Sequence, residues 1–309
     1  NDPQRLKKSA AQHPAARAVV SLEELAASQD VQGVVVAASA VSHYTLAKAL
    51  LEAGKDVFVE KPLALSVRHA EELVRIARER GRILMVGHLL LFHPAVRYLK
   101  GMVERGELGD LFYIYSQRVN LGKVRRDENA LWSFAPHDIS VILHLLEVEP
   151  VDVAARGSAF LQGTVEDVVF LHLRFPGGRM AHVHVSWLDP HKLRKINVVG
   201  SRTMVVFDAM EASEKIRVYD KGIDRAGQIV SYGDALSVRS GDILIPRISL
   251  QEPLRIECQH FVDCVREHRT PLTDGADGLR VVRVLAAAQQ SLAAGGMPIA
   301  VSPQPAGVA

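Results

Sequence analysis

The chain has 309 residues, 48% of them hydrophobic, and a formal net charge of +2. This length is sufficient for two domains, each with a well-filled hydrophobic core. Acidic and basic residues alternate along the chain, which is not the pattern of a nucleic-acid-binding protein. The sequence contains no apolar run of membrane-spanning length and no recognisable signal peptide, so we expect no membrane partner.

The two cysteines, Cys258 and Cys264, fall in one predicted helix. At a rise of about 1.5 Å per residue their Cα atoms would lie about 9 Å apart, which is too far for a disulfide bond. Free thiols are typical of proteins in a reducing compartment. The cysteine usage therefore predicts a cytoplasmic protein.

The first third of the chain alternates short apolar strands with longer helical segments. Ser21, with Glu24 three residues later, has the form of a capping box, and Ser66 and Gly81 mark the start and end of another helix. This alternation predicts right-handed βαβ units and a parallel sheet, and hence a doubly wound α/β domain over residues 1–109. The predicted helices are 4–12, 44–53 and 66–80, and the predicted strands are 17–20, 31–39, 56–59 and 83–86.

From residue 110 onward the pattern changes to strands with one apolar and one polar face. This pattern predicts an α+β domain over residues 110–301, built on a large and mostly antiparallel sheet. Residues 302–309 are expected to be a frayed tail. The predicted strands are 111–119, 168–175, 180–187, 196–199, 204–207 and 216–219, and the predicted helices are 136–146, 253–268 and 278–294.

The segment Glu60-Lys61-Pro62 directly follows a predicted buried strand. Ligands of open α/β sheets bind at this carboxyl edge, and partial desolvation there would make the Lys61 amine a better proton acceptor. The alternative is an ordinary lysine of a surface loop. The position after a buried strand favours a functional role.

Two histidines lie near predicted helix starts. His43 follows the small residues after the strand 31–39, where it either touches a bound cofactor or bonds the backbone, and the sequence leaves both open. Pro136 is expected in the first turn of a helix, which would place His137 beside free backbone N–H groups. A histidine there could accept a proton from a substrate hydroxyl, although a structural role is the alternative.

The order of these motifs resembles the Gfo/Idh/MocA family of NAD(P)-dependent oxidoreductases along nearly the whole chain. The resemblance rests on Glu60-Lys61-Pro62, the later Val-Gly-His ending at His88, Phe-His-Pro-Ala at 92–95, and a helix opening with His137-Asp138. It implies an NAD or NADP cofactor and an incomplete Rossmann domain followed by the α+β domain. It also implies that Lys61 contacts the substrate hydroxyl and the nicotinamide region, and that His137 is the proton acceptor.

The sequence departs from the family pattern in two places. The family opens with a strand and a Gly-rich turn that cradles the pyrophosphate, and neither precedes Asn1 here. We therefore expect the chain as written to bind dinucleotide poorly and the natural protein to contain the missing unit. Many family members also have Asp four residues before the catalytic histidine, where this chain has Ser133, whose hydroxyl would orient His137 more weakly.

Within the family, residues 117–123 and 132–138 look most like a branch that oxidises the 3-hydroxyl of a UDP-N-acetylhexosamine or its uronic acid. Two alternatives stay open: a dehydrogenase of a free polyol, inositol or aldose, and a sensor that binds dinucleotide or sugar without turnover. The implied cofactor contacts are Ser39, His43, Glu60, Lys61 and His88. The implied substrate contacts are Arg118, Asn120, Lys123, Arg126, Trp132, Ser133 and Asp138.

His172, His182 and His184 alternate along two predicted strands. The family uses no metal and no cysteine joins these residues, so we predict half-exposed or interface histidines and no metal site. A large sheet with an apolar outer face also suggests packing between subunits, and we expect a homodimer or homotetramer.

Overall fold

The computed structural model describes residues 3–122, 124–126, 128–225 and 236–301. The first unit contains residues 3–87 and Gln259–Gly278, and the second contains His88–Cys258 and residues 279–301. Residues 88–109 thus group with the second unit, whereas the domain boundary expected from the sequence lies at 109–110. That boundary stays a prediction, and the predicted tail, 302–309, lies outside the described residues.

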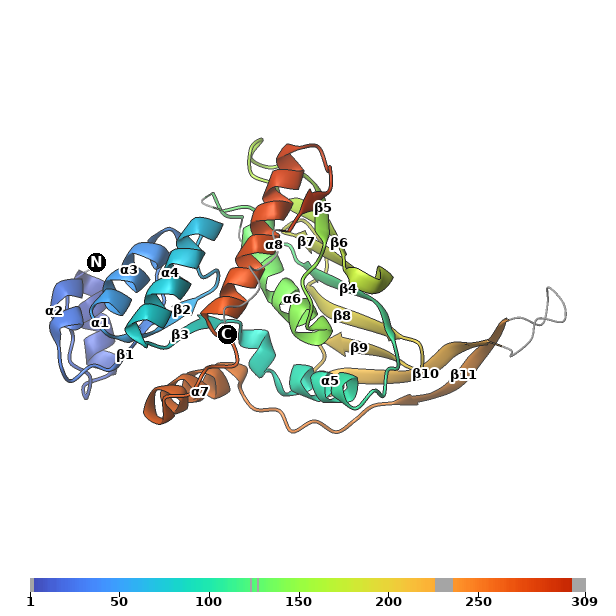
Figure 1. Ribbon diagram of the computed structural model, residues 1–309, viewed down its shortest axis with the longest axis horizontal. Helices are drawn as coiled ribbons and strands as arrows, with labels where there is room; N and C mark the ends of the chain where they lie inside the picture. Colours follow the sequence, from blue (N-terminus) through green and yellow to red (C-terminus); the bar gives the residue numbers. More distant parts are fainter. Residues whose placement is uncertain (1–2, 123, 127, 226–235, 302–309) are drawn as a thin grey trace. The chain divides into compact units, whose positions relative to one another are not determined.

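The first unit is built on a three-stranded parallel sheet with strand order β1-β2-β3. Its strands are β1 (Gly33–Val36), β2 (Asp56–Glu60) and β3 (Leu84–Gly87), connected by helices α3 (Ala40–Glu52) and α4 (Val67–Arg80), as Figure 1 shows. All four residues of β3 are buried, as expected for a parallel strand covered on both faces. The predicted parallel sheet is confirmed.

Capping side chains explain where the helices of this unit begin. The Ser66 hydroxyl accepts a hydrogen bond from His69 N at 3.2 Å, and Gly81 ends α4 with a φ of 58°. Ser21 caps α2 (Leu22–Ala27), and α1 is Pro3–Gln12. Helix α3 begins at Ala40, before the predicted start, because Ser39 adopts the extended N-cap conformation. The strand predicted at 17–20 was wrong, since these residues pair with no strand in the described part of the chain.

The second unit contains a nine-stranded sheet with the order β11-β10-β9-β8-β4-β7-β6-β5-β12. Among the described strands of this sheet only β4 and β7 pair in parallel, so the predicted mostly antiparallel sheet is confirmed. The strands are β4 (Leu111–Val119), β5 (Asp152–Ser158), β6 (Val168–Arg174), β7 (Met180–Ser186), β8 (Leu193–Gly200), β9 (Met204–Asp208), β10 (Ile216–Arg225), β11 (Leu236–Leu244) and β12 (Ile299–Ala300).

One face of this sheet is buried beneath helix α6 (Ala130–Leu146), which contacts β4, β6 and β7. In β6, Val169, Leu171 and Leu173 are buried and the alternate side chains are exposed, as the alternation predicted. The remaining helices are α5 (Pro94–Glu104), α7 (Pro253–Glu267) and α8 (Gly275–Ala293), with the 3-10 turns η1 (Leu89–Phe92) and η2 (Pro176–Gly178) (Figure 1).

Helix α6 begins six residues before the predicted start. Asn129 is its N-cap, and the Asn129 Oδ1 atom accepts a hydrogen bond from Trp132 N at 3.1 Å. Pro136 therefore lies inside the helix, and the expectation that it occupies the first turn was wrong. His137 is consequently the eighth residue of the helix, at the start of the third turn, and not beside the free N–H groups of the helix start.

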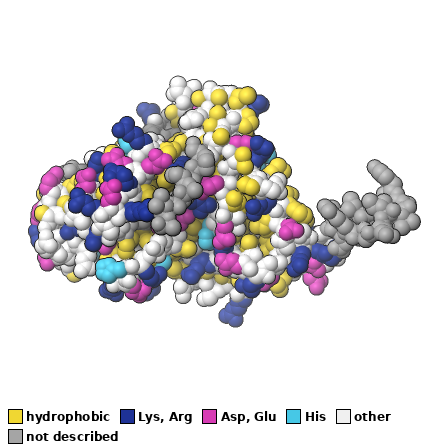
Figure 2. Space-filling view, in the orientation of Figure 1, with side chains coloured by type: hydrophobic (Ala, Val, Ile, Leu, Met, Phe, Trp, Pro, Cys, Tyr) yellow, Lys and Arg dark blue, Asp and Glu magenta, His cyan; other side chains and the backbone are white. Residues whose placement is uncertain are grey.

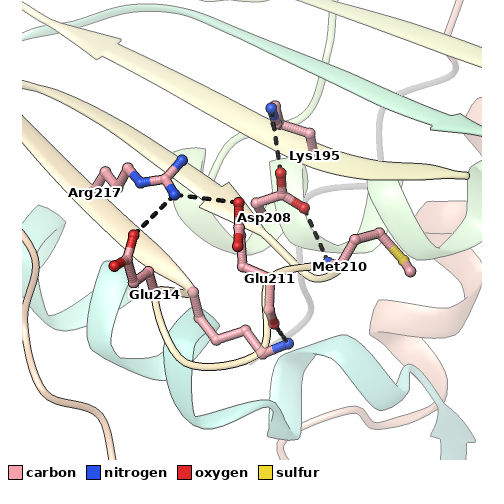
Figure 3. A network of polar contacts seen from close by, with 7 residues as sticks. Lys195, Asp208, Met210, Glu211, Glu214 and Arg217 are labelled. Carbon is pink, nitrogen blue, oxygen red and sulfur yellow. Dashed lines mark hydrogen bonds and ion pairs between the residues drawn. The ribbon is translucent and has the colours of Figure 1, made fainter. Parts of the chain in front are cut away.

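The turn between β9 and β10 is fixed by a cluster of ion pairs (Figure 3). Arg217 contacts both Glu214 and Glu211, at 2.9 and 3.2 Å, and Lys195 of β8 contacts Asp208 at 3.2 Å. Asp208 also accepts a hydrogen bond from Met210 N at 2.9 Å. These charges neutralise one another within the turn, and we assign them no role in ligand binding.

Charged side chains of both signs lie on the surface. Figure 2 shows acidic and basic side chains intermingled on the face in view, without a large area of one sign. Within the described residues, no helix is long and apolar enough to cross a membrane.

Candidate active site

The carboxyl ends of β1 and β2 lie side by side in the first unit. The two strands are parallel, with Val36 opposite Val59, so the loops that follow them leave the same edge of the sheet. Ala37, Ala38 and Ser39 follow β1 and are exposed, while Glu60 ends β2 and Lys61 follows it. Small exposed residues beside a strand end allow a dinucleotide to approach the backbone. This edge therefore fits the cofactor that the sequence predicts.

Gly87 completes this edge at the end of β3, opposite Glu60. A Cβ atom on Gly87 would lie 3.0 Å from Glu60 Oε2, so the Glu60 carboxylate rests against a position without a side chain. The absence of a side chain at Gly87 keeps Glu60 on this edge, next to the half-buried Lys61. Ser39 is the N-cap of α3, and its hydroxyl lies 3.5 Å from that of Ser42.

His43 is buried, with only 1% of its surface exposed. Its Nδ1 atom lies 2.7 Å from the carbonyl oxygen of Pro62, and its Nε2 atom lies 3.0 Å from that of Ala38. The structure thus shows the backbone partners that were one of the two alternatives. A direct contact with cofactor stays a prediction.

His88 directly follows β3 and is also 1% exposed. It is the N-cap residue of η1, and its carbonyl oxygen accepts a hydrogen bond from Leu91 N at 2.9 Å. Its position after β3 is that of a strand-end residue, as predicted. Its contact with cofactor is likewise untested and stays a prediction.

In the second unit, α6 carries His137 and Ser133 on one face, because residues four apart are neighbours on a helix. Ser133 is buried and His137 is partly exposed. The Ser140 hydroxyl donates to the carbonyl oxygen of His137 at 2.9 Å. The helix therefore places Ser133 where the sequence comparison expects the residue that orients His137.

Arg118 and Asp138 form a buried ion pair between β4 and α6. Arg118 Nε lies 2.6 Å from Asp138 Oδ2, and a second guanidinium nitrogen lies 3.4 Å from Oδ1. Their side chains are 8% and 1% exposed. The Asp138 carboxylate is therefore directed at Arg118. Contact of either side chain with substrate stays a prediction.

Arg194 lies beside this pair and was not identified from the sequence. It is opposite Arg118 in the register of β4 and β8, and its side chain has no ion pair or hydrogen bond among the described residues. Although part of the side chain is exposed, its pKa lies below the usual range because of burial, and also because of repulsion by Arg118, which Asp138 partly offsets. An arginine at a core-facing strand position was the signal in the sequence.

The other predicted substrate contacts are spread over two segments. Trp132 is near the start of α6, where its indole N–H donates to Gln289 Oε1 at 3.1 Å, so its ring face is the part available for a ligand. Asn120 follows β4, and its backbone N–H donates to Ser186 O at 3.2 Å. Arg126 is exposed. Lys123 lies outside the described residues.

The three histidines of the outer sheet face form a cluster of rings with Phe170, in which His182 and His184 stack on Phe170 and His172 is tilted against His182. The rings of Phe170 and His184 are 4.3 Å apart, and those of His172 and His182 are 5.0 Å apart. Burial lowers the pKa of His182 and of His184, and the charge of the neighbouring histidines lowers that of His182 further. In the part of the chain that the structure describes, no group of His, Cys, Asp or Glu has the arrangement of a metal site.

Family comparisons agree with this architecture. Residues 1–88 match the Gfo/Idh/MocA oxidoreductase family with its NAD-binding Rossmann fold, and residues 96–206 match the Gfo/Idh/MocA C-terminal domain. The oxidoreductase YceM of Salmonella typhimurium is 30% identical over 279 residues, which are 87% of this chain and 80% of the relative. The chain belongs to the Gfo/Idh/MocA oxidoreductase family. As a member it is an NAD-dependent oxidoreductase with a Rossmann domain and a large-sheet domain, as the sequence predicted.

Relatives within the family act on different sugars. A UDP-N-acetylglucosamine 3-dehydrogenase of Acidithiobacillus ferrooxidans is 26% identical over 275 residues, 89% of this chain and 81% of the relative. Its solved structure aligns with a TM-score of 0.78 at 24% identity, over 94% of this chain and 87% of that chain. An inositol dehydrogenase homolog from Azotobacter vinelandii, solved with NADH and myo-inositol, has the same fold, with a TM-score of 0.74 at 21% identity over 90% of this chain and 80% of that chain. Three further curated relatives are matched over only 46%, 49% and 57% of their lengths.

Proposed function

We propose that the protein oxidises a secondary hydroxyl of a sugar, and that the reacting position is C3 of a UDP-N-acetylhexosamine or of its uronic acid. The observation that carries this proposal is the similarity to UDP-N-acetylglucosamine 3-dehydrogenase over 89% of the chain. Arg194 adds independent support, because a guanidinium with no hydrogen bond or ion pair to the described residues suits a substrate with a diphosphate or carboxylate group. A free polyol has no such group.

In the proposed reaction the sugar carbon loses a hydride and its hydroxyl loses a proton. A bound nicotinamide dinucleotide would supply the hydride acceptor, and Ser39, Glu60 and Lys61 are the residues of the strand-end edge that would hold it. His137 takes the hydroxyl proton as a general base, and the Lys61 amine contacts the hydroxyl oxygen and holds it in position. Lys61 belongs to the first unit and His137 to the second. The proposed role of each residue follows from its position within its own unit and from the family pattern.

The test is an assay of the complete protein with NAD or NADP and a panel of sugars: UDP-N-acetylglucosamine, its uronic acid, myo-inositol and glucose. We expect reduced nicotinamide with a UDP-sugar and a keto group at C3 of the product. Higher kcat/KM with myo-inositol or glucose would instead support a dehydrogenase of free sugars. Measurable cofactor or sugar binding without any reduced nicotinamide would support the sensor.

The proposal includes assembly into a homodimer or homotetramer in the cytoplasm. The outer face of the large sheet supports assembly, because Phe170 and Met180 on that face are 44% and 47% exposed. These two residues are on neighbouring strands with the His172–His182 pair between them, and exposed apolar side chains on a sheet face are common in subunit interfaces. The two free cysteines, of which Cys264 is buried, remain the support for a reducing compartment.

A further inference from the structure

His43 connects two loops that leave the same edge of the parallel sheet. Its Nδ1 atom lies 2.7 Å from the carbonyl oxygen of Pro62, in the loop after β2, and its Nε2 atom lies 3.0 Å from that of Ala38, in the loop after β1. A carbonyl oxygen only accepts, so the ring donates to whichever loop faces its N–H, and it donates to both only when both ring nitrogens carry a proton. Lys61 precedes Pro62 directly, and Ser39 follows Ala38 directly. One buried side chain therefore holds the loop of the proposed reactive lysine beside the loop of a proposed cofactor contact.

A buried histidine needs polar partners wherever it lies, so hydrogen bonds alone would indicate only a satisfied core residue. The position of the partners is the additional observation. Neither carbonyl is in helix α3, which carries His43, and each is within one residue of a predicted site residue. A single imidazole of the helix thus lies between the two loops, and only 1% of its surface is exposed.

We propose that His43 is a positioning residue that fixes the Lys61 loop through Pro62 and the Ser39 loop through Ala38. It touches neither substrate nor cofactor in this role, because its ring is enclosed and its nitrogens face the backbone. Misplacement of a reacting group by about 1 Å can cost about 10²-fold in rate, so a loop contact of this kind affects turnover. The effect on turnover rests on the proposed function of Lys61, whereas the effect on the loops does not.

The two ring nitrogens can be separated by substitution. In His43→Asn the carboxamide lies near the former Nδ1 position and can still donate to Pro62 O. In His43→Gln it lies near the former Nε2 position and can still donate to Ala38 O. Each variant therefore retains one loop contact and loses the other. Tyr44→Phe is the matched control, because Tyr44 is on the same helix and its hydroxyl donates to Glu72 at 2.7 Å, away from both loops.

The experiment measures kcat, cofactor affinity and amide hydrogen exchange of the complete protein and the three variants. In His43→Gln we expect kcat to fall about tenfold to hundredfold, with faster exchange at residues 61–65. In His43→Asn we expect kcat within about threefold of wild type, weaker cofactor binding and faster exchange at residues 38–40. Tyr44→Phe should change neither kcat nor the exchange of these loops.

Equal losses of kcat in both His43 variants, or faster exchange spread equally over the whole unit, would overturn the positioning role and leave a structural histidine. If no sugar supports turnover in the wild-type protein, the proposed function fails. The loop-specific pattern of hydrogen exchange then still decides the role of His43, because it requires no catalysis.

Discussion

The Arg118 guanidinium and the Asp138 carboxylate meet at 2.6 Å on the buried face of the large sheet, with side chains that are 8% and 1% exposed. The pair joins β4 to α6, the helix that carries His137. Because Asp138 is adjacent to His137 in sequence, this ion pair fixes the rotation of α6 at the position of the proposed base. A buried pair of this kind contributes to specificity of packing more than to net stability.

Removal of one residue of this ion pair should therefore destabilise the folded protein. In Asp138→Leu the Arg118 charge is buried without compensation, and we expect the free energy of unfolding to fall by about 3–5 kcal/mol. Urea denaturation measures this change. The double variant Arg118→Met/Asp138→Leu is the control and should be more stable than either single variant. A double variant that is less stable than both singles would contradict this account.

Lys61→Met tests the reactive lysine. The substitution keeps the length of the side chain but removes the amine, so we expect kcat to fall by about 10²–10⁴-fold, with folding and cofactor affinity nearly unchanged. Steady-state kinetics, thermal unfolding and cofactor titration of the complete protein provide the three measurements. Undiminished turnover would exclude the assigned role.

Arg194→Gln tests the anion contact. Since Arg194 has no ion pair among the described residues, its loss should leave stability unchanged. We expect KM for a UDP-sugar to rise about tenfold or more, because a hydrogen bond to a charged group contributes about 1.5–3 kcal/mol. The matched control is Lys192→Gln, two residues away, which should change KM little. An unchanged KM in Arg194→Gln would remove Arg194 from the site.

Much of the fold could be predicted because the sequence patterns of single helices and strands agree with the way these elements pack. The predicted strands 31–39 and 56–59 contain the parallel strands β1 and β2, of which β2 is buried over 56–59, and Ser66 with Gly81 delimits α4 as expected. By contrast, the apolar signal in 17–20 was too short and found no partner strand. Strand β5 was missed because its sequence, DVAARGS, lacks a clear apolar alternation, and its place is fixed by pairing with β6.

The sequence motifs of the candidate site could be predicted, but the contacts between its charged residues could not. Pro136 marks the first turn of many helices, yet here Asn129 caps the helix earlier and the proline is accommodated inside it. Asp138 and Arg118 are 20 residues apart in sequence and are brought together by the packing of α6 on β4, whereas Arg194 is placed opposite Arg118 by the register of β4 and β8. A single sequence contains no signal for that register.

The outer face of the large sheet leads to a prediction about the oligomeric state. Phe170 is half exposed and stacks on His184 at 4.3 Å, in the centre of the proposed contact face. We expect light scattering to give the mass of a dimer or tetramer for the wild-type protein, and a smaller species for Phe170→Asp, because a charge there would be buried on assembly. A monomeric wild-type protein at micromolar concentration would contradict the proposed assembly.

The His93 side chain should make the stability of the folded protein depend on pH. It caps α5 by accepting a hydrogen bond from Ala95 N on its Nδ1 atom, and its ring packs against Phe207. Burial, together with the charge of Lys215, lowers the pKa of His93 from 6.5 to about 4. The folded state thus favours the neutral ring, so its contribution is complete above about pH 6.5 and is lost as pH falls toward about 4.

We expect this contribution to be about 1–2 kcal/mol, because a shift of this size corresponds to about 3 kcal/mol and partial exposure of the ring reduces it. His93→Asn retains an acceptor for Ala95 N but does not titrate. Urea denaturation at several pH values should therefore show a smaller loss of stability between neutral and mildly acidic pH in the variant than in the wild type. His144 and His182, whose pKa values are also lowered, remain in both proteins and give the same background. Identical pH profiles would show that the His93 ring is protonated at little cost in the folded state.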